Sequence, residues 1–213
     1  MQVKLLNITP NAEEHIVEIA RVSSSRKNKK DKPEGLLRYL VQHKHWSPLE
    51  HGHATFEIET SKAIGIQLIR HRSFSFQEFS QRYQDVNRLG DIFEPIELRA
   101  QCEDNRQSST KVINPLLPNG VSSDASIKVH LERSHQLYND LLEVGIAREQ
   151  ARMVLPLVTT TKIHMTGSIR SWIHFLELRD DGHAQKEIQL IAKEIKHIFI
   201  QEFPIISKAL GYE

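Results

Sequence analysis

The segment RHRSFSFQEFSQRY at residues 70–83 concentrates side chains that could hold an anion. Arg70 and Arg72 flank a histidine, and Ser80 and Arg82 follow within the same short segment. A guanidinium presents a planar fork of N–H donors and a serine hydroxyl adds one more, so together they suit a phosphate or another anion. We therefore expect this segment to bind an anionic ligand.

The residues just before this segment predict the helix that positions it. Ala63, Ile66 and Ile69 are spaced as one apolar stripe of a helix, and Ser61 stands where an N-cap belongs. Basic residues at a helix C-terminus complement the helix dipole, which would explain the run starting at Arg70 without any ligand. The helix dipole does not explain the hydroxyl of Ser80 or the guanidinium of Arg82. We therefore expect the chain to leave the helix as an aromatic-bearing loop.

Residues 70–72, Arg-His-Arg, are separated by seven residues from Ser80, and this pattern resembles the signature of flavin-dependent thymidylate synthases. Other blocks also resemble segments of that family and fall in the family's order. They are HWSPLEH at 45–51, ARMVLP at 151–156 and SIRSWIHFLELRDDGHAQ at 168–185. The resemblance covers most of the chain, from residue 20 to residue 185, and leaves residues 99–124 unmatched.

The resemblance implies an enzyme that methylates dUMP at C5 to give dTMP. It implies tightly bound FAD, with methylenetetrahydrofolate as carbon donor and NADPH as reductant. It also implies a homotetramer whose active sites lie at subunit interfaces. Cys102, the only cysteine, lies in the unmatched polar stretch, so a thiolate nucleophile is not expected. The cofactor carries the difficult chemistry and the protein positions it.

The family's motifs also imply roles for individual residues. Arg179 is the expected catalytic residue, because a guanidinium beside the uracil ring offsets the negative charge that develops there. Eight residues are expected at dUMP: Gln67, Arg70, Glu78, Ser80, Gln81, Arg82, Arg152 and Arg179. Nine are expected at FAD: His45, Ser47, Arg70, His71, Arg72, Glu78, Ser168, Arg170 and His174. Two of these, Ser168 and His174, stand where some members have asparagine. By the same resemblance, Glu50 and His51 are expected to help build the pocket.

Several residue patterns have other interpretations. The histidines in HKHWSPLEHGH at 43–53 could suggest a metal, but the segment lacks an HExxH pattern and a cysteine partner, and Pro48 interrupts any helix, so no metal is expected. Asp180, Asp181 and His183 could form an acid–base set, or they could simply be a charged helix start. Arg152 could instead extend to solvent along its aliphatic stem.

Two other functions remain open from the sequence. One is a related flavin- and folate-using enzyme with a hydroxymethyl product or a cytosine nucleotide as substrate. The other is a nucleic-acid-binding module that uses Arg70, Arg72 and the basic loop at 26–32. The net charge of +1 argues against the second, since it gives no large field for nucleic acid or for an anionic membrane.

Length and composition predict one soluble globular domain over residues 1–213, with 39% hydrophobic and 26% charged residues. No apolar stretch reaches transmembrane length and no signal peptide is evident. A lone cysteine allows no intrachain disulfide, so a cytoplasmic location is expected.

The hydrophobic patterns predict an α+β fold, with a small mixed or antiparallel sheet packed by several long helices. Asn11 and Glu14 match a capping box, and Gly145 is expected to close a long helix. Strands are expected at 3–9, 53–60 and 157–167. Helices are expected at 11–22, 36–42, 62–70, 126–145, 148–155, 168–178 and 184–203, and a loop or insertion at 99–124.

Overall fold

A computed structural model describes residues 1–23 and 33–212 of the protein. Most of the basic loop expected between residues 23 and 35, including the segment at 26–32, lies outside the described residues. The chain divides into two compact units. The first comprises Met1–Glu59, Gln67–Gln77 and Ile163–Glu213, and the second comprises Thr60–Ile66 and Glu78–Lys162.

The first unit is built on most of a four-stranded sheet. The strands lie in the order β1 (Gln2–Ile8), β2 (His53–Ser61), β6 (Thr160–Ser168) and β3 (Phe74–Glu78). β1 and β2 are antiparallel, and Leu5 lies opposite Phe56. Alternate residues of β2, Ala54, Phe56 and Ile58, are buried, as their spacing predicts. The last residues of β2, after residue 59, and the last residue of β3, after residue 77, belong to the second unit. The first residues of β6 belong to it as well.

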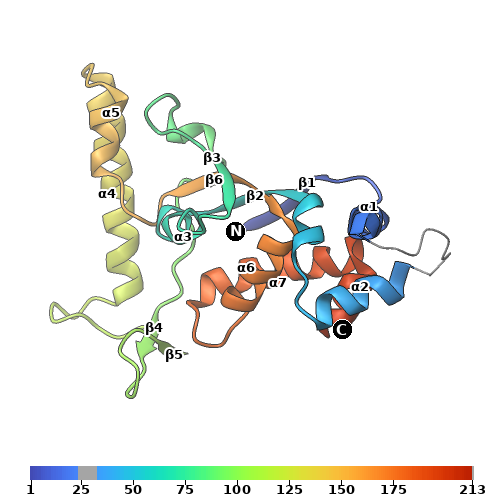
Figure 1. The fold of residues 1–213 in the computed structure, drawn as a ribbon. Helices are drawn as coiled ribbons and strands as arrows, with labels where there is room; N and C mark the ends of the chain where they lie inside the picture. The colour runs from blue at the N-terminus through green and yellow to red at the C-terminus, as the bar shows by residue number, and fades with distance from the viewer. Residues whose placement is uncertain (24–32, 213) are drawn as a thin grey trace. The chain divides into compact units, whose positions relative to one another are not determined.

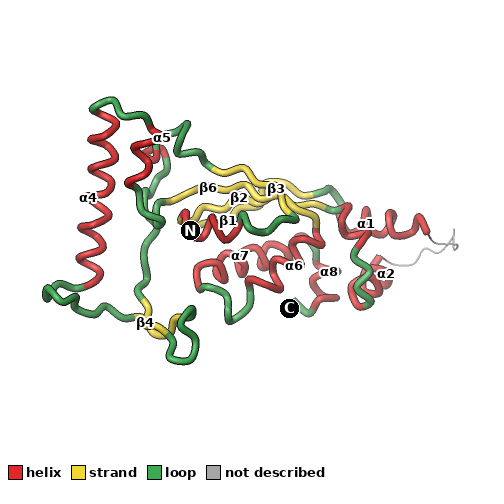
Figure 2. Tube along the Cα trace, turned by 60° about the vertical axis from the view of Figure 1, so that its left-hand side comes forward, coloured by secondary structure: helices red, strands yellow, loops and turns green. Residues whose placement is uncertain are grey.

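Helices cover one face of this sheet, and Figure 2 shows α6 and α7 below the strands. Trp172 of α6 packs edge-on against Phe56 and Phe74, with ring centroids 4.8 and 4.6 Å apart. In α7, Ile188, Ile191, Ile195 and Phe199 share the buried face that the sequence predicts. The helices of this unit are α1 (Ala12–Ala20), α2 (Pro33–Gln42), α6 (Ile169–Arg179), α7 (Lys186–Glu202) and α8 (Pro204–Leu210).

The second unit contains a long helix, α4, whose buried side chains include Tyr138. Tyr138 packs with Val86 and Ala151, and Leu141 and Leu142 pack against this cluster. α4 lies beside the short helix α5 (Figure 1). Its elements are β4 (Arg99–Gln101), β5 (Ser109–Val112), α4 (Ser123–Glu143), α5 (Arg148–Ala151) and most of α3 (Lys62–Leu68).

The α+β class and the small antiparallel sheet are confirmed. The N-cap at Ser61 is also confirmed, since its hydroxyl accepts the Ile64 N–H at 3.4 Å. Gly145 closes α4 with φ +86°, a conformation that favours glycine. The assignment of residues 1–213 to one domain stays a prediction.

Several local predictions were wrong. Residues 74–78 form a strand, not a loop, because Phe74 and Phe76 alternate with polar residues and point to one face of the sheet. Residues 99–124 contain a two-stranded hairpin. Asn11 adopts φ +49° and its side chain makes no capping bond, so the expected capping box is absent.

The apolar stripe of α3 was also misassigned. Its buried residues include Ile64 and Leu68, whereas Ile66 and Ile69 are 48% and 43% exposed. The helix ends at Leu68, so Ile69 lies beyond it.

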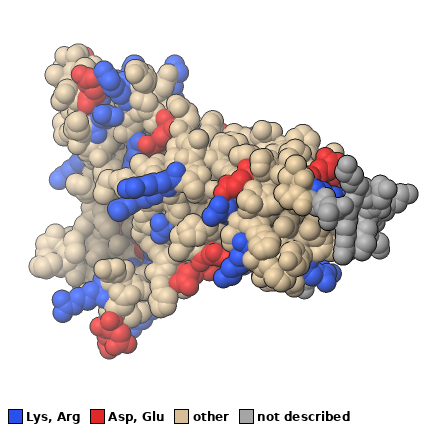
Figure 3. Space-filling view, in the orientation of Figure 1, with Lys and Arg blue, Asp and Glu red and all other residues tan. Residues whose placement is uncertain are grey.

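None of the helices in the described part of the chain combines the length and apolarity that crossing a membrane would need. On the face drawn in Figure 3, basic and acidic side chains are interspersed and neither sign fills a broad area. This distribution agrees with the nearly balanced charge of the sequence.

Candidate active site

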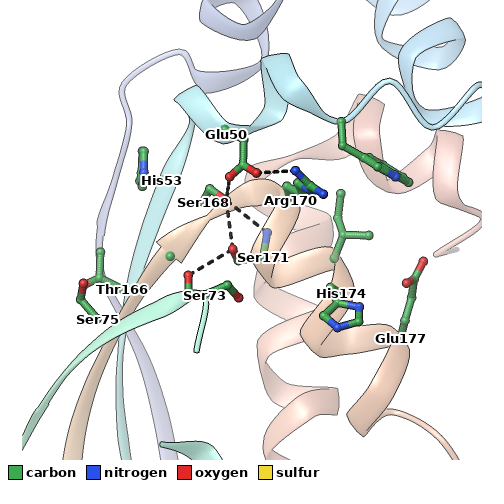
Figure 4. Close-up of a pocket in the computed structure, with 13 residues that line it drawn as sticks. Glu50, His53, Ser73, Ser75, Thr166, Ser168, Arg170, Ser171, His174 and Glu177 are labelled. Carbon is green, nitrogen blue, oxygen red and sulfur yellow. Dashed lines mark hydrogen bonds and ion pairs between the residues drawn. The ribbon is translucent and has the colours of Figure 1, made fainter. Parts of the chain in front are cut away.

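The first unit contains a pocket of about 740 Å³, within the size range of small-molecule sites. Five segments form it: the 3₁₀ turn at Ser47–His51, strands β2, β3 and β6, and helix α6. Polar side chains from all of them surround it (Figure 4). They include Glu50, His53, Ser75, Thr166, Ser168, Arg170, Ser171, His174 and Glu177.

Glu50 is the centre of a hydrogen-bond network on one wall of this pocket (Figure 4). Arg170 Nη1 donates to its Oε1 at 2.7 Å, and Ser168 Oγ donates to its Oε2 at 2.7 Å. The bond from Ser168 lowers the pKa of Glu50 against the opposing effect of partial burial, and Arg170 adds to the lowering. Glu50 therefore stays ionised and fixes the direction of the Arg170 side chain.

Ser168 also begins the helix that carries the rest of this wall. It is the N-cap of α6, where its hydroxyl accepts the backbone N–H of Ser171 at 3.2 Å. Arg170, His174 and Glu177 then follow at helical spacing, so they lie on the exposed face of α6 and line the pocket. This face presents one cation, one imidazole and one carboxylate to a ligand.

Arg179, the last residue of α6, contacts the Arg-His-Arg run. Its Nε–H donates to Nε2 of His71 at 2.9 Å. Burial, with smaller effects from Arg179 and His174, lowers the pKa of His71 to about 4. Burial and the nearby Arg70 lower the pKa of Arg179. Two guanidinium groups thus lie close together in the first unit, an arrangement that favours an anionic ligand.

The second unit holds three buried polar side-chain atoms whose partners are missing from the described residues: Thr160 Oγ1 and two nitrogen donors. Gln81 Nε2 and Arg152 Nε are both inaccessible to solvent and make no hydrogen bond there. Buried polar groups are nearly always paired, so such donors call for an explanation such as a ligand. Arg152 is half-buried as a residue, and its Nε is buried.

Three other predicted residues of the second unit have different surroundings. Glu78 Oε1 accepts from Lys62 Nζ and from Thr161 Oγ1, both at 2.8 Å. Arg82 Nε contacts Glu149 Oε2 at 3.1 Å in an exposed ion pair. Ser80 is half-buried just before Gln81.

The residues expected at FAD line two neighbouring pockets of the first unit, and the residues expected at dUMP are distributed over both units. Ser168, Arg170 and His174 line the pocket of Figure 4, whereas His45 and Ser47, with Arg170, line a neighbouring pocket of about 760 Å³. The residues expected at dUMP fall in both units. Gln67, Arg70 and Arg179 belong to the first unit, and Glu78, Ser80, Gln81, Arg82 and Arg152 belong to the second.

Glu50 and His51 were expected to help build the pocket. Glu50 organises one wall of it, and His51 lines the neighbouring pocket. The sequence prediction missed Ser171 and Glu177. Ser171 is about one turn along α6 from Ser168, and Glu177 is about two turns from Arg170, so this helical spacing was the available signal. Among the described residues, no three His, Cys, Asp or Glu side chains are grouped closely enough to hold a metal ion.

Comparison with known proteins decides the family. Residues 4–205 match the family described as "Thymidylate synthase complementing protein". The chain belongs to this family. It is 43% identical, over the whole of both chains, to the "Probable flavin-dependent thymidylate synthase" of Paramecium bursaria Chlorella virus 1. It is 41% identical, over 91% of this chain and 86% of the relative, to the "Flavin-dependent thymidylate synthase" of Synechocystis sp..

A solved structure supports the same membership. The UMP/dUMP methylase PolB from Streptomyces cacaoi, bound with 5-Br dUMP, has a similar fold with a TM-score of 0.78 and 29% identity. The match covers 99% of this chain and 94% of the methylase. The resemblance to flavin-dependent thymidylate synthases is therefore confirmed, and this member of the family is an enzyme of the methyltransferase class.

Proposed function

We propose that the enzyme converts dUMP to dTMP by reductive methylation at C5, with methylenetetrahydrofolate as carbon donor, FAD as cofactor and NADPH as reductant. In each turnover the folate supplies a CH₂ group and the reductant supplies the hydride that completes the methyl group. The hydrogen on C5 leaves as a proton, and the two folate nitrogens that held the CH₂ group each take up a proton, so tetrahydrofolate and NADP⁺ are released and one proton is consumed overall. The overall reaction is then balanced in atoms and electrons.

The observation that carries this proposal is the pair of unpaired buried donors, Gln81 Nε2 and Arg152 Nε. Both occupy positions that the family motifs assign to the nucleotide. A phosphate or a pyrimidine carbonyl would satisfy them, since both offer acceptor oxygens. Leaving such donors unsatisfied costs about 1–3 kcal/mol each, so a fold that keeps them buried is suited to a ligand rich in acceptors.

The pocket of Figure 4 fits a flavin in its size and donors. The sequence has no G-x-G-x-x-G, so side chains must hold the diphosphate. Arg170, held by Glu50, and His174 supply donors there, and Arg70 and Arg72 follow from the motif. When bound, the flavin supplies hydride transfer.

Among the residues of this protein, Arg179 has the main role in the reaction. Its guanidinium stays protonated and carries terminal N–H donors that can face the pyrimidine ring. Negative charge grows on that ring as C5 becomes nucleophilic, so a donor fixed in advance stabilises the transition state more than the ground state. Ser80, Gln81, Arg82 and Arg152 would hold the rest of the nucleotide.

We also propose that the enzyme is a cytoplasmic homotetramer with active sites at subunit interfaces. Exposed apolar side chains support self-association: Val129 and Leu137 on α4 are 46% and 47% exposed, and Met153 is 69% exposed. The lone Cys102 is consistent with a reducing compartment. Light scattering during size-exclusion chromatography would show four chains per particle, and a stable monomer would contradict the assembly.

The test is release of tritium from C5 of dUMP, combined with chromatographic identification of the nucleotide product. We expect release and thymidylate only when folate donor and reductant are both present. Parallel reactions with dCMP and with UMP test the related pyrimidine-modifying activities, UMP because the methylase from Streptomyces cacaoi is described as acting on it. A hydroxymethyl product, or faster turnover of dCMP or UMP, would overturn the proposed substrate or product.

A matched pair of variants connects the activity to the buried donors. Arg152→Ala removes one of them and should raise the KM for dUMP by roughly ten- to a hundredfold, from the loss of a charge-assisted hydrogen bond. Arg106→Ala removes an exposed arginine of the same unit and should leave KM unchanged. Equal KM values for the two variants would show that Arg152 does not hold the nucleotide.

A further inference from the structure

His71 is held in one orientation by its neighbours. The residue is buried, with 9% of its surface exposed. Its ring lies edge-on to Phe175 at 5.0 Å and to Phe74 at 6.2 Å between centroids. One ring atom, Nε2, accepts the Nε–H of Arg179 at 2.9 Å. Turning the ring breaks this hydrogen bond, and a turn out of its present plane also breaks the aromatic packing.

This contact determines the protonation state of the imidazole. Nε2 can accept only with its lone pair free, so the single proton of the ring must be on Nδ1. A protonated imidazolium would present an N–H toward the guanidinium N–H and place two positive charges side by side. The low pKa of His71, about 4, agrees with a neutral ring at physiological pH.

The same contact leaves the other end of Arg179 available. Nε is committed to His71, and no acceptor among the described residues contacts the two terminal nitrogens. Because the guanidinium is planar, fixing Nε and the aliphatic stem also fixes the plane and direction of the terminal fork. Arg179 is therefore oriented before any ligand arrives.

We propose that His71 is a positioning residue that acts through Arg179: as the Nδ1–H tautomer, it holds the guanidinium so that the terminal nitrogens face the pyrimidine ring of the nucleotide. This role rests on the proposed function, and it differs from the flavin contact that the sequence motif implies for His71. Preorganised donors are effective because they need no reorientation during the reaction.

A double-mutant cycle tests the coupling. His71→Phe keeps the ring and its packing but removes both nitrogens. We expect it to lower kcat by roughly ten- to a hundredfold, because a hydrogen bond to a charged group is lost. The KM for dUMP should change less. In an Arg179→Ala background the same substitution should change kcat by less than about twofold, because residues acting as one unit are not additive. Fully multiplicative effects on kcat would overturn the proposal.

Two readouts separate this role from flavin binding or folding. Flavin content and melting temperature of His71→Phe should stay near wild type, and a loss of flavin as large as the loss in kcat would favour a flavin contact instead. If His71→Phe does not fold, His71→Gln serves in the same cycle, because a glutamine carbonyl oxygen can accept in place of Nε2. It should retain more activity than His71→Ala, and equal losses would overturn the proposal.

Nitrogen NMR of histidine-labelled protein tests the contact without any activity. The signals of His71, identified by their loss in a His71 variant, should show a neutral Nδ1–H tautomer at neutral pH. They should change in Arg179→Ala. A neutral Nε2–H tautomer or a protonated ring would overturn the positioning contact. If the wild type does not turn over dUMP, the proposed function fails, and the NMR result still decides whether His71 holds Arg179.

Discussion

Replacing Arg82 with alanine separates two roles of the same side chain. In the structure, Arg82 Nε contacts Glu149 Oε2 at 3.1 Å, with 59% and 48% of the two side chains exposed. Exposed ion pairs contribute only about 0.2–1 kcal/mol to stability. For a chain of this size, a loss of about 1 kcal/mol lowers the melting temperature by roughly 2–4 °C. We therefore expect Arg82→Ala to fold and melt nearly as the wild type does.

The expected effect on nucleotide binding is larger. If Arg82 holds the phosphate, alanine forfeits a charge-assisted hydrogen bond of about 1.5–3 kcal/mol. This loss raises the KM for dUMP by roughly ten- to a hundredfold. Initial rates measured across dUMP concentrations give KM, and the visible absorbance of the same samples gives flavin content, which should change little.

Glu149→Gln is the matched control, because it weakens the same ion pair and keeps Arg82. It should leave KM unchanged or lower it slightly, since the guanidinium is then free to meet the phosphate. An unchanged KM in Arg82→Ala would refute phosphate binding by this residue. An equal rise in KM in Glu149→Gln would show that nucleotide binding depends on the ion pair and not on a direct contact of the Arg82 guanidinium.

Three further outcomes follow. Arg179→Ala should lower kcat at saturating dUMP by about a hundred- to a thousandfold, and Arg179→Lys should recover only part of it, because lysine lacks the planar fork. Cys102→Ser should leave turnover intact, since no step uses a thiolate. The folded-state pKa of His71, about 4, lies below its usual 6.5, so its neutral form contributes stability that is complete above pH 6.5 and is lost as pH falls toward 4. This loss amounts to at most about 3 kcal/mol and should be smaller in His71→Phe.

Each of these outcomes has a measurement that could contradict it. Near-normal turnover of folded Arg179→Ala would show that Arg179 has no catalytic role and only ends α6. Complete loss of turnover in folded Cys102→Ser would contradict a reaction without a protein thiolate. Denaturant unfolding of wild type and His71→Phe from pH 7 to pH 4 tests the third, and parallel stability curves would show that His71 does not titrate as described.

Local patterns in the sequence predicted the elements well where one periodicity dominates. The alternation Ala54, Phe56, Ile58 gave a strand with the correct buried face, and the isoleucines of α7 gave a helix with the correct face. β3 was missed because it lies between the Arg-His-Arg run and Ser80, where only Phe74 and Phe76 show the alternation. The stripe of α3 was misassigned because a helix of seven residues has too few turns to define one face.

The site itself depends on contacts that a sequence pattern cannot supply. Glu50 meets Ser168 and Arg170 across more than a hundred residues, and His71 meets Arg179 across a similar separation. The motifs identified Arg170 and His71 as functional residues, but not which atoms they use. Only the folded arrangement shows that Glu50 fixes Arg170 and that a neutral His71 accepts a hydrogen bond from Arg179.

Flavin-dependent methylation of dUMP is tested by following the visible absorbance of the FAD-loaded enzyme without oxygen. Addition of NADPH should bleach the flavin absorbance. Addition of dUMP together with methylenetetrahydrofolate should then restore it, with one thymidylate formed for each flavin reoxidised, and neither compound alone should do so. A protein that binds no flavin, or a flavin whose absorbance returns without formation of thymidylate, would contradict flavin-dependent methylation of dUMP.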